Sequence, residues 1–149
     1  MDSIELERRI GKLVESAGFH LISANWHPVR GRQHLRVLSD AEDHNISVEE
    51  CADLSHQISD LLDSYPHDFP DYRLEVSSPG LNHPLKKWQF EKNVGRSVEV
   101  RYQEEGKQVV FKGELTKVMK DSFAVNFGEH IREFAFDIDN SVFVIPSLK

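Results

Sequence analysis

Two hydroxyl groups and an imidazole lie close together in the stretch SSPGLNHPL, at Ser77, Ser78 and His83. A hydroxyl nucleophile with a histidine base is the chemistry of covalent catalysis. Such a serine typically sits in a Gly-x-Ser-x-Gly elbow, and neither serine lies in one. No acidic residue has an evident role in orienting His83. The stretch therefore predicts no catalytic residue.

Metal and cofactor chemistry is not indicated either. Among the eight histidines, His20, His27 and His34 fall in one region, without the close pairing of a zinc motif. Cys51 is the only cysteine, which excludes an internal disulfide and a thiolate cluster within one chain, and we expect it in the core. There is no glycine-rich phosphate loop. We expect no metal, no cofactor and no small-molecule substrate.

Basic side chains are placed where they could bind the phosphates of RNA. Arg30 and Arg32 flank a glycine, and a planar guanidinium can donate two hydrogen bonds to one phosphate. A second group mixes cations with an aromatic side chain that could stack on a base. The candidate contacts with RNA, or with an assembly that contains RNA, are Arg30, Arg32, Lys86, Lys87, Trp88, Lys92 and Arg96. The alternatives are a solvated turn for the two arginines and packing of Trp88 between domains.

Acidic side chains gather in the first half of the chain. Residues 1–78 contain 7 Lys and Arg against 15 Asp and Glu, a net charge of −8, whereas residues 79–149 contain 11 against 10, a net charge of +1. The candidate acidic protein-binding face is Glu42, Asp43, Glu49, Glu50 and Asp53. Each acid alone is also explained by the polar face of an amphipathic helix, but together they could attract a strongly basic protein.

The totals describe a chain that can build packed cores. Its 149 residues, 39% apolar and 29% charged, suffice for one ordinary domain or two small ones. The net charge of −7 argues against a protein that coats nucleic acid through a strongly basic surface. Apolar runs fall far short of the ~20 residues that cross a bilayer, and no signal peptide is evident. We expect a cytoplasmic monomer without a membrane partner.

The predicted elements that position these residues differ between the two halves of the chain, because the hydrophobic periodicity changes halfway along it. The first half predicts helix, strand, strand, helix, strand, with one helix capped at Asp2 or Ser3 and the next begun by a Ser47–Glu50 capping box. The simplest arrangement of these elements is a three-stranded sheet with both helices on one face. The expected strands are residues 19–27, 33–39 and 72–77, with residues 28–32 as the loop of a hairpin.

The second half predicts a short helical segment at residues 88–93 and then five strands with tight turns. Such short strands favour a small barrel of the SH3-like or OB type, because closure removes exposed sheet edges. The expected strands are residues 97–103, 108–118, 122–127, 131–137 and 142–145. The fold class is thus α+β: a two-layer α-β-β-α-β domain at residues 1–78, a junction at 79–96, and an all-β SH3-like small barrel at 97–149.

The prolines and glycine of SSPGLNHPL suit a short, stiff junction between these domains. Pro79-Gly80 fits a tight turn, since proline presets φ and glycine accepts a positive φ, and Pro84 stiffens the exit. The signature and junction residues are Ser77, Ser78, Pro79, Gly80, Leu81, Pro84 and Leu85.

At these residues the sequence resembles the ribosome maturation factor RimP family. The resemblance lies in LEVSSPGL at residues 74–81, the polar pair Asn82-His83, Pro84-Leu85, Phe90-Glu91 and Val94-Gly95-Arg96, with a further likeness at residues 46–55. The family commonly has a basic residue in the polar pair. With His83 there, a phosphate contact would be weaker and dependent on pH.

The resemblance implies a non-enzymatic assembly factor with an N-terminal α/β domain and a C-terminal SH3-like barrel. It implies binding to the immature small ribosomal subunit, both protein and ribosomal RNA, with the ribosomal protein S-twelve as the expected protein partner. Two other classes stay open: a general RNA-binding protein of the small-barrel kind, and an enzyme of unknown type.

Overall fold

A computed structural model describes residues 1–136 and 140–146 of the chain. The chain divides into two compact units, Met1–Pro79 and Gly80–Lys149. Within the described residues, no helix is both long and apolar enough to span a membrane.

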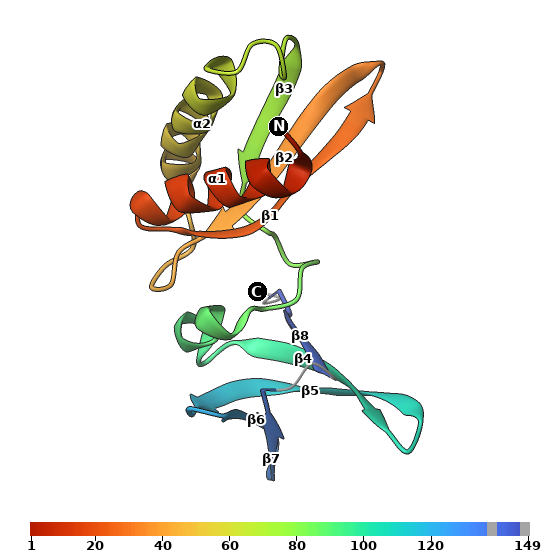
Figure 1. Cartoon of the computed structure of the whole chain (residues 1–149). Helices are drawn as coiled ribbons and strands as arrows, with labels where there is room; N and C mark the ends of the chain where they lie inside the picture. Colours follow the sequence, from red (N-terminus) through yellow and green to blue (C-terminus); the bar gives the residue numbers. More distant parts are fainter. Residues whose placement is uncertain (137–139, 147–149) are drawn as a thin grey trace. The chain divides into compact units, whose positions relative to one another are not determined.

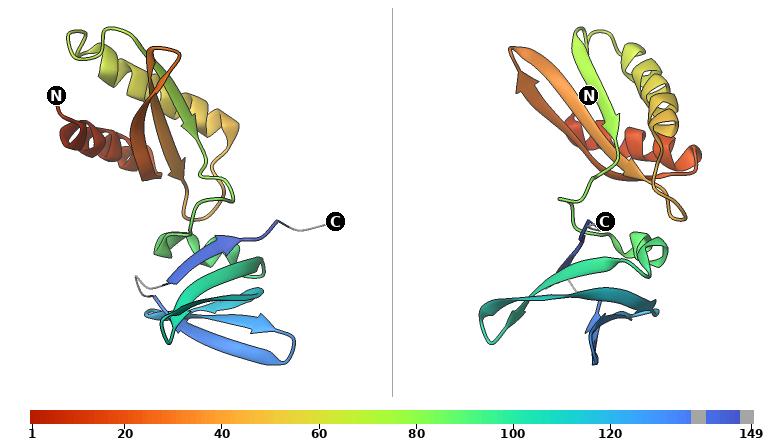
Figure 2. Two further views of the ribbon diagram at one scale, coloured as in Figure 1. Left: turned by 90° about the vertical axis from the view of Figure 1, so that its right-hand side faces the viewer. Right: turned by 180° about the vertical axis from the view of Figure 1, so that it is seen from behind.

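The first unit is a three-stranded sheet covered by two helices. Its elements are α1 (Ser3–Ser16), β1 (His20–Val29), β2 (Arg32–Asp40), α2 (Val48–Asp63) and β3 (Tyr72–Ser77). The strand order is β1-β2-β3, with β1 and β2 antiparallel and β2 and β3 parallel. Both helices lie on the same face of this sheet (Figures 1 and 2). The element order expected from the sequence is confirmed.

The core of the first unit lies between this sheet and the helices. Apolar residues at helical spacing supply one side, and the inward residues of β2 supply the other. The fully or nearly fully buried members are Leu6, Ile10, Val14, Leu35, Val37, Leu54, Ile58 and Leu62. Cys51 belongs to the same core, as expected. The start of α1 is capped by the Asp2 carboxylate, which accepts a hydrogen bond from the Glu5 amide at 2.8 Å.

The hairpin between β1 and β2 is tighter than the sequence suggested. The expected loop at residues 28–32 is wrong, because pairing continues through Pro28↔Gln33 and Val29↔Arg32. Only Arg30 and Gly31 form the turn, with φ of 50° and 80°. Positive φ at both central residues is the geometry of a type I′ turn, which matches the twist of the flanking strands. Pro28 is tolerated because β1 is an edge strand.

The second unit is built from five antiparallel strands that follow two short 3₁₀ turns. The turns are η1 (Lys87–Gln89) and η2 (Glu91–Asn93); the strands are β4 (Ser97–Glu104), β5 (Lys107–Val118), β6 (Ser122–Phe127), β7 (His130–Ala135) and β8 (Asn140–Val144). The strand order is β7-β6-β5-β4-β8 (Figure 1). An α+β fold with a largely all-β second half is thereby confirmed. Asp137, the last residue of one expected strand, lies outside the described residues.

The segment before β4 is packed into this second unit. Phe90 is buried in its core, with its ring centroid 4.9 Å from that of Phe123. The Leu85 amide donates to the carbonyl of Val142 in β8 at 2.7 Å, and the Gly95 amide donates to the carbonyl of Leu115 at 2.7 Å. Backbone pairing therefore ties both ends of this segment to the sheet.

One close approach between strands makes a sharp prediction. A Cβ atom at Gly113 in β5 would lie 2.5 Å from the backbone oxygen of Asn126 in β6. Because neither backbone can move without breaking the sheet pairing, Gly113→Ala should destabilise the second unit by about 1–3 kcal/mol. Amide hydrogen exchange, which follows each unit separately, measures the loss.

The matched control is Gly11→Ala in α1. There the new Cβ would lie 3.6 Å from Leu21 Cδ2, which is ordinary contact. Alanine is the better helix former, so this variant should stabilise the first unit by up to about 1 kcal/mol. Unchanged protection of the β5 and β6 amides in Gly113→Ala would contradict the prediction.

Candidate functional site

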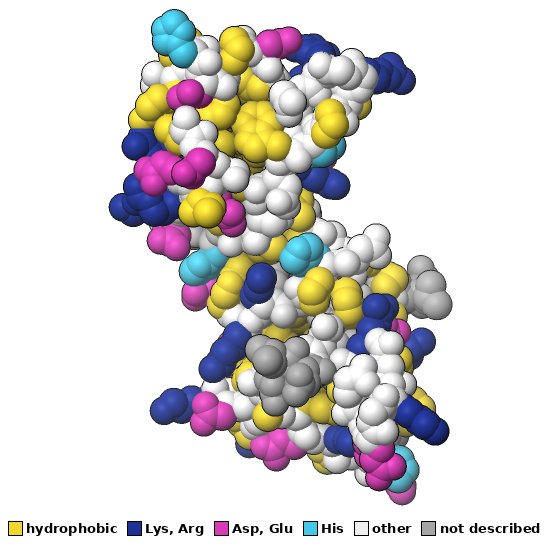
Figure 3. Space-filling view, turned by 45° about the vertical axis from the view of Figure 1, so that its right-hand side comes forward, with side chains coloured by type: hydrophobic (Ala, Val, Ile, Leu, Met, Phe, Trp, Pro, Cys, Tyr) yellow, Lys and Arg dark blue, Asp and Glu magenta, His cyan; other side chains and the backbone are white. Residues whose placement is uncertain are grey.

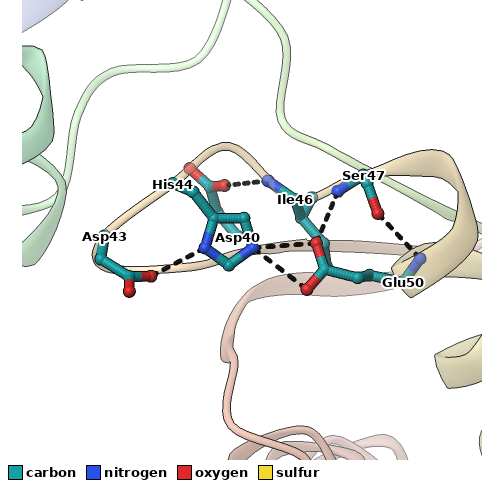
Figure 4. Close-up of polar contacts among 6 residues, drawn as sticks. All are labelled: Asp40, Asp43, His44, Ile46, Ser47 and Glu50. Carbon is teal, nitrogen blue, oxygen red and sulfur yellow. Dashed lines mark hydrogen bonds and ion pairs between the residues drawn. The ribbon is translucent and has the colours of Figure 1, made fainter.

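The loop that leads into α2 holds a cluster of charged side chains (Figure 4). The His44 ring lies between two carboxylates, with Nδ1 2.7 Å from Asp43 and Nε2 2.9 Å from Glu50. The Glu50 carboxylate also accepts from the Ser47 amide, while the Ser47 hydroxyl accepts from the Glu50 amide. The capping box expected from the sequence is confirmed, and His44 fixes it to the preceding loop.

A buried carboxylate supports the same loop from within. Asp40, at the end of β2, is buried and accepts a hydrogen bond from the Ile46 amide at 3.0 Å (Figure 4). Ile46 in turn packs into the core of the first unit. The loop that carries the acidic residues is therefore anchored to the sheet and not merely solvated.

The double contact of His44 predicts that the stability of the first unit depends on pH. Hydrogen bonds to Asp43 and then to Glu50 raise the pKa of His44 above its ordinary value. A raised pKa means that the folded state holds the proton more tightly, so this stabilisation is present at low pH. It is lost as the pH rises through the folded pKa. We expect His44→Gln to reduce the fall in stability between about pH 6 and pH 8.

The measurement is the free energy of urea unfolding at pH 6 and at pH 8, with the amide signals of α2 as the probe. His67→Gln is the control, since His67 is an exposed histidine in the turn after α2. A pH dependence that is the same in the His44 variant and in the unsubstituted chain would show that the cluster does not couple to folding.

The other acidic candidates are spread over the loop and the solvent side of α2. Glu42 pairs with His20 at 2.8 Å, and Glu49 and Asp53 are exposed. The helix carries five acids and no lysine or arginine over Val48–Asp63. The face of the first unit visible in Figure 3 carries Lys and Arg as well as Asp and Glu side chains around a gathering of hydrophobic ones. Of the five predicted acids, the structure brings together only Asp43 and Glu50, through His44.

The two arginines of the hairpin differ in their surroundings. Arg30 is exposed at the turn itself, whereas the Arg32 guanidinium donates to the Asp71 carboxylate at 2.8 Å. Further along β2, Arg36 lies 3.8 Å from Glu75. A phosphate at this hairpin would therefore meet Arg30 directly and would have to compete with Asp71 for Arg32.

The signature segment runs from one unit to the other. Ser77 is the last residue of β3 and pairs with Leu38, and Pro79 and Gly80 lie on either side of the division. Gly80 has the positive φ expected of this glycine, +69°, but the turn itself lies at Leu81 and Asn82 and not at Pro79-Gly80. Ser77 and Ser78 belong to the first unit and His83 to the second. Over the described part of the chain, no cluster of His, Cys, Asp and Glu could hold a metal ion.

The basic segment at residues 86–96 covers one end of the second sheet. Lys86, Lys87 and Arg96 are exposed, and Trp88 and Lys92 are half-buried. The Lys87 ammonium lies 5.1 Å from the ring centroid of Phe136. The backbone of the two 3₁₀ turns is fixed by the buried side chains of Gln89, Phe90 and Asn93, so the cations project from a rigid support. These five predicted residues are already neighbours in the sequence, and the structure adds which of them are exposed.

A groove on the second unit was not expected from the sequence. It has a volume of about 500 Å³ and is lined by residues that include Leu81, Glu99, Arg101, Lys112 and Phe143. The Arg101 guanidinium stacks 4.3 Å from the Phe143 ring centroid and donates to Glu99 at 2.6 Å. Cations held against an aromatic ring suit a base or a phosphate. Alternation on β4 puts Glu99 and Arg101 on one face, but only the pairing Glu99↔Phe143 reveals the aromatic neighbour.

These features define a two-unit α+β protein with an acidic helix on one unit and cationic surfaces on the other. Its first unit also matches a known family: residues 9–82 match the model of the RimP N-terminal domain. The chain belongs to the RimP family of ribosome maturation factors.

Proposed function

We propose that this chain is a non-enzymatic assembly factor that binds the immature small ribosomal subunit. The observation that carries the proposal is the match of residues 9–82 to the RimP N-terminal domain. The separation of charge supports it, because an acidic first unit and a nearly neutral second unit with a basic segment at residues 86–96 can engage protein and RNA at the same time. Stabilising one intermediate arrangement of the subunit requires only such differential binding.

The RNA contacts are assigned to the second unit and to the hairpin tip. The segment with Lys86, Lys87, Trp88, Lys92 and Arg96 supplies cations and one aromatic side chain. The groove at Arg101 adds a guanidinium stacked on an aromatic ring. Arg30 and Arg32 extend the cationic contacts to the hairpin of the first unit, although Arg32 is paired with Asp71.

The protein contact is assigned to the acidic side of the first unit. Glu42, Asp43, Glu49, Glu50 and Asp53 lie on α2 and on the loop before it. A strongly basic ribosomal protein of the small subunit fits this charge, and S-twelve is the proposed partner. The chain is proposed to act as a cytoplasmic monomer.

We assign the second unit to the SH3-like small barrels because its sheet curls strongly. Phe134 of β7 contacts Tyr102 of β4 with ring centroids 5.3 Å apart, although two strands lie between them. Arg132 of β7 also donates to the Tyr102 hydroxyl at 2.6 Å. The proposed domains are residues 1–78 and 97–149, and residues 79–96 are the segment that connects them.

A pelleting assay tests the function directly. The purified chain is mixed at near-physiological salt with immature small subunits, mature small subunits or whole ribosomes. The proposal requires preferential co-pelleting with immature small subunits. Equal binding to all three, or binding to none, would leave a binding protein whose partner lies elsewhere.

A second candidate function is general RNA binding, favoured by the stacked Arg101 and Phe143. It predicts affinity for naked RNA that falls steeply with salt and is indifferent to the maturity of the subunit. The same pelleting assay, repeated with protein-free ribosomal RNA, separates the two functions.

The junction provides a further prediction. If Pro79 and Pro84 limit the orientations of the two units, replacing both with glycine raises the entropic cost of engaging two sites at once. We expect several-fold weaker binding to the immature subunit. Amide hydrogen exchange should show that the fold of each unit is unchanged. Unchanged affinity would remove this role from the junction.

A further inference from the structure

The first unit contains an apolar groove that its own core does not fill. The groove has a volume of about 460 Å³ and lies between the beginning of α2 and the end of β3. Val48, Cys51 and Ala52 line it from the helix, and Leu74 and Val76 line it from the strand. Val48 is 88% exposed. An apolar surface of this kind beside a strand is typical of a binding site for another chain.

The strand beside this groove has a free edge. In the sheet order β1-β2-β3, β3 pairs with β2 on one side and with no other strand that the structure describes. An edge strand presents unpaired N–H and C=O groups, which can pair with an added strand. Ser77 and Ser78 of the signature line the same groove, at the end of this edge.

The charge around the groove restricts what can occupy it. Glu49 and Asp53 lie on the helix stripe next to Val48 and Ala52, and α2 carries no lysine or arginine. The groove itself is lined mainly by apolar side chains and small hydroxyls. A strand that lies here would place alternate side chains toward the groove. The fitting occupant has apolar residues at those alternate positions and basic residues between and beside them.

We propose that an extended basic segment of a partner protein binds this groove by adding a fourth strand to β3. Backbone hydrogen bonds to the free edge provide affinity, and the groove and the acids of α2 select the sequence. The inference rests on the proposed function, in which a basic ribosomal protein supplies the segment, and it specifies how that protein is held.

The test uses a labelled peptide of about ten residues with alternating lysine and valine and with blocked termini. The N–H groups of successive residues in a strand point to opposite sides, so only every second residue of an added strand donates a hydrogen bond to its neighbour. Two further peptides are therefore N-methylated, one on the valines and one on the lysines. With the full chain at near-physiological salt, fluorescence anisotropy should show binding of the parent and of one methylated peptide, and at least tenfold weaker binding of the other. Equal binding of both methylated peptides would overturn strand addition.

Two variants of α2 distinguish binding in the groove from a general effect of the charge of the helix. Ala52→Lys places a cation in the groove, whereas Gln57→Lys makes the same change of charge at another exposed position of the helix. Ala52→Lys should weaken binding of the parent peptide at least tenfold, and Gln57→Lys should weaken it less than about threefold. Equal weakening by both variants, or no binding of the peptide to the unsubstituted chain, would overturn the inference.

The pelleting assay distinguishes this inference from the function on which it rests. If the peptide fails to bind while the chain still pellets with immature small subunits, the groove assignment is wrong and the assembly function stands. If the peptide binds as expected while no subunit is bound, the groove is correct and the assembly function is wrong.

Discussion

Phe123→Ala is expected to destabilise the second unit by about 3–5 kcal/mol, the usual cost of removing a large buried aromatic side chain. Phe123 in β6 is fully buried. Its ring centroid lies 4.9 Å from that of Phe90, 5.5 Å from Phe134 and 5.2 Å from Phe136. One ring therefore joins the segment before β4 to β6, β7 and the residue after β7.

Hydrogen exchange of the β4 and β5 amides measures this loss. The control is Phe127→Ala on the same strand, where the side chain is exposed and the cost should stay below about 1 kcal/mol. The α2 amides of the first unit should keep their protection in both variants, because that unit has its own core. Similar losses in both variants would contradict the central place of Phe123.

Elements determined by local sequence could be predicted from the chain alone. The Ser47–Glu50 capping box and the apolar stripe behind it fix the start of α2 within a few residues, and the structure contains both. The strand and helix order of the first unit follows from similarly local periodicity. The prediction that the first strand ends before Pro28 is wrong, because β1 is an edge strand, which tolerates proline, and its pairing continues to Val29.

Features that depend on distant pairing could not be predicted. The stacking of Arg101 on Phe143 requires β8 to lie beside β4, about forty positions away in the sequence. The Arg32–Asp71 ion pair likewise depends on the folded unit, and it changes how a phosphate could use Arg32. His44 lies only six residues from Glu50, but nothing in the spacing shows that its ring bridges two carboxylates.

The second large effect is expected for RNA binding by the double variant Lys86→Gln and Lys87→Gln. Both lysines are exposed. They lie on the segment that the core of the second unit holds in place through Phe90. Each phosphate contact releases counterions, so each one lost should reduce the slope of log affinity against log salt by about 0.7–0.9. For two contacts, affinity at about 0.1 M salt should fall by more than tenfold.

Filter binding of ribosomal RNA across a series of salt concentrations measures both the slope and the affinity. The matched control is Lys12→Gln with Lys107→Gln, which removes two exposed cations outside this segment. It changes the net charge of the chain equally and should alter the slope little. Because Lys87 also lies over Phe136, Lys87→Arg keeps the cation and should retain the affinity. If both double variants lower the slope equally, RNA responds to overall charge, and residues 86–96 are not a distinct contact.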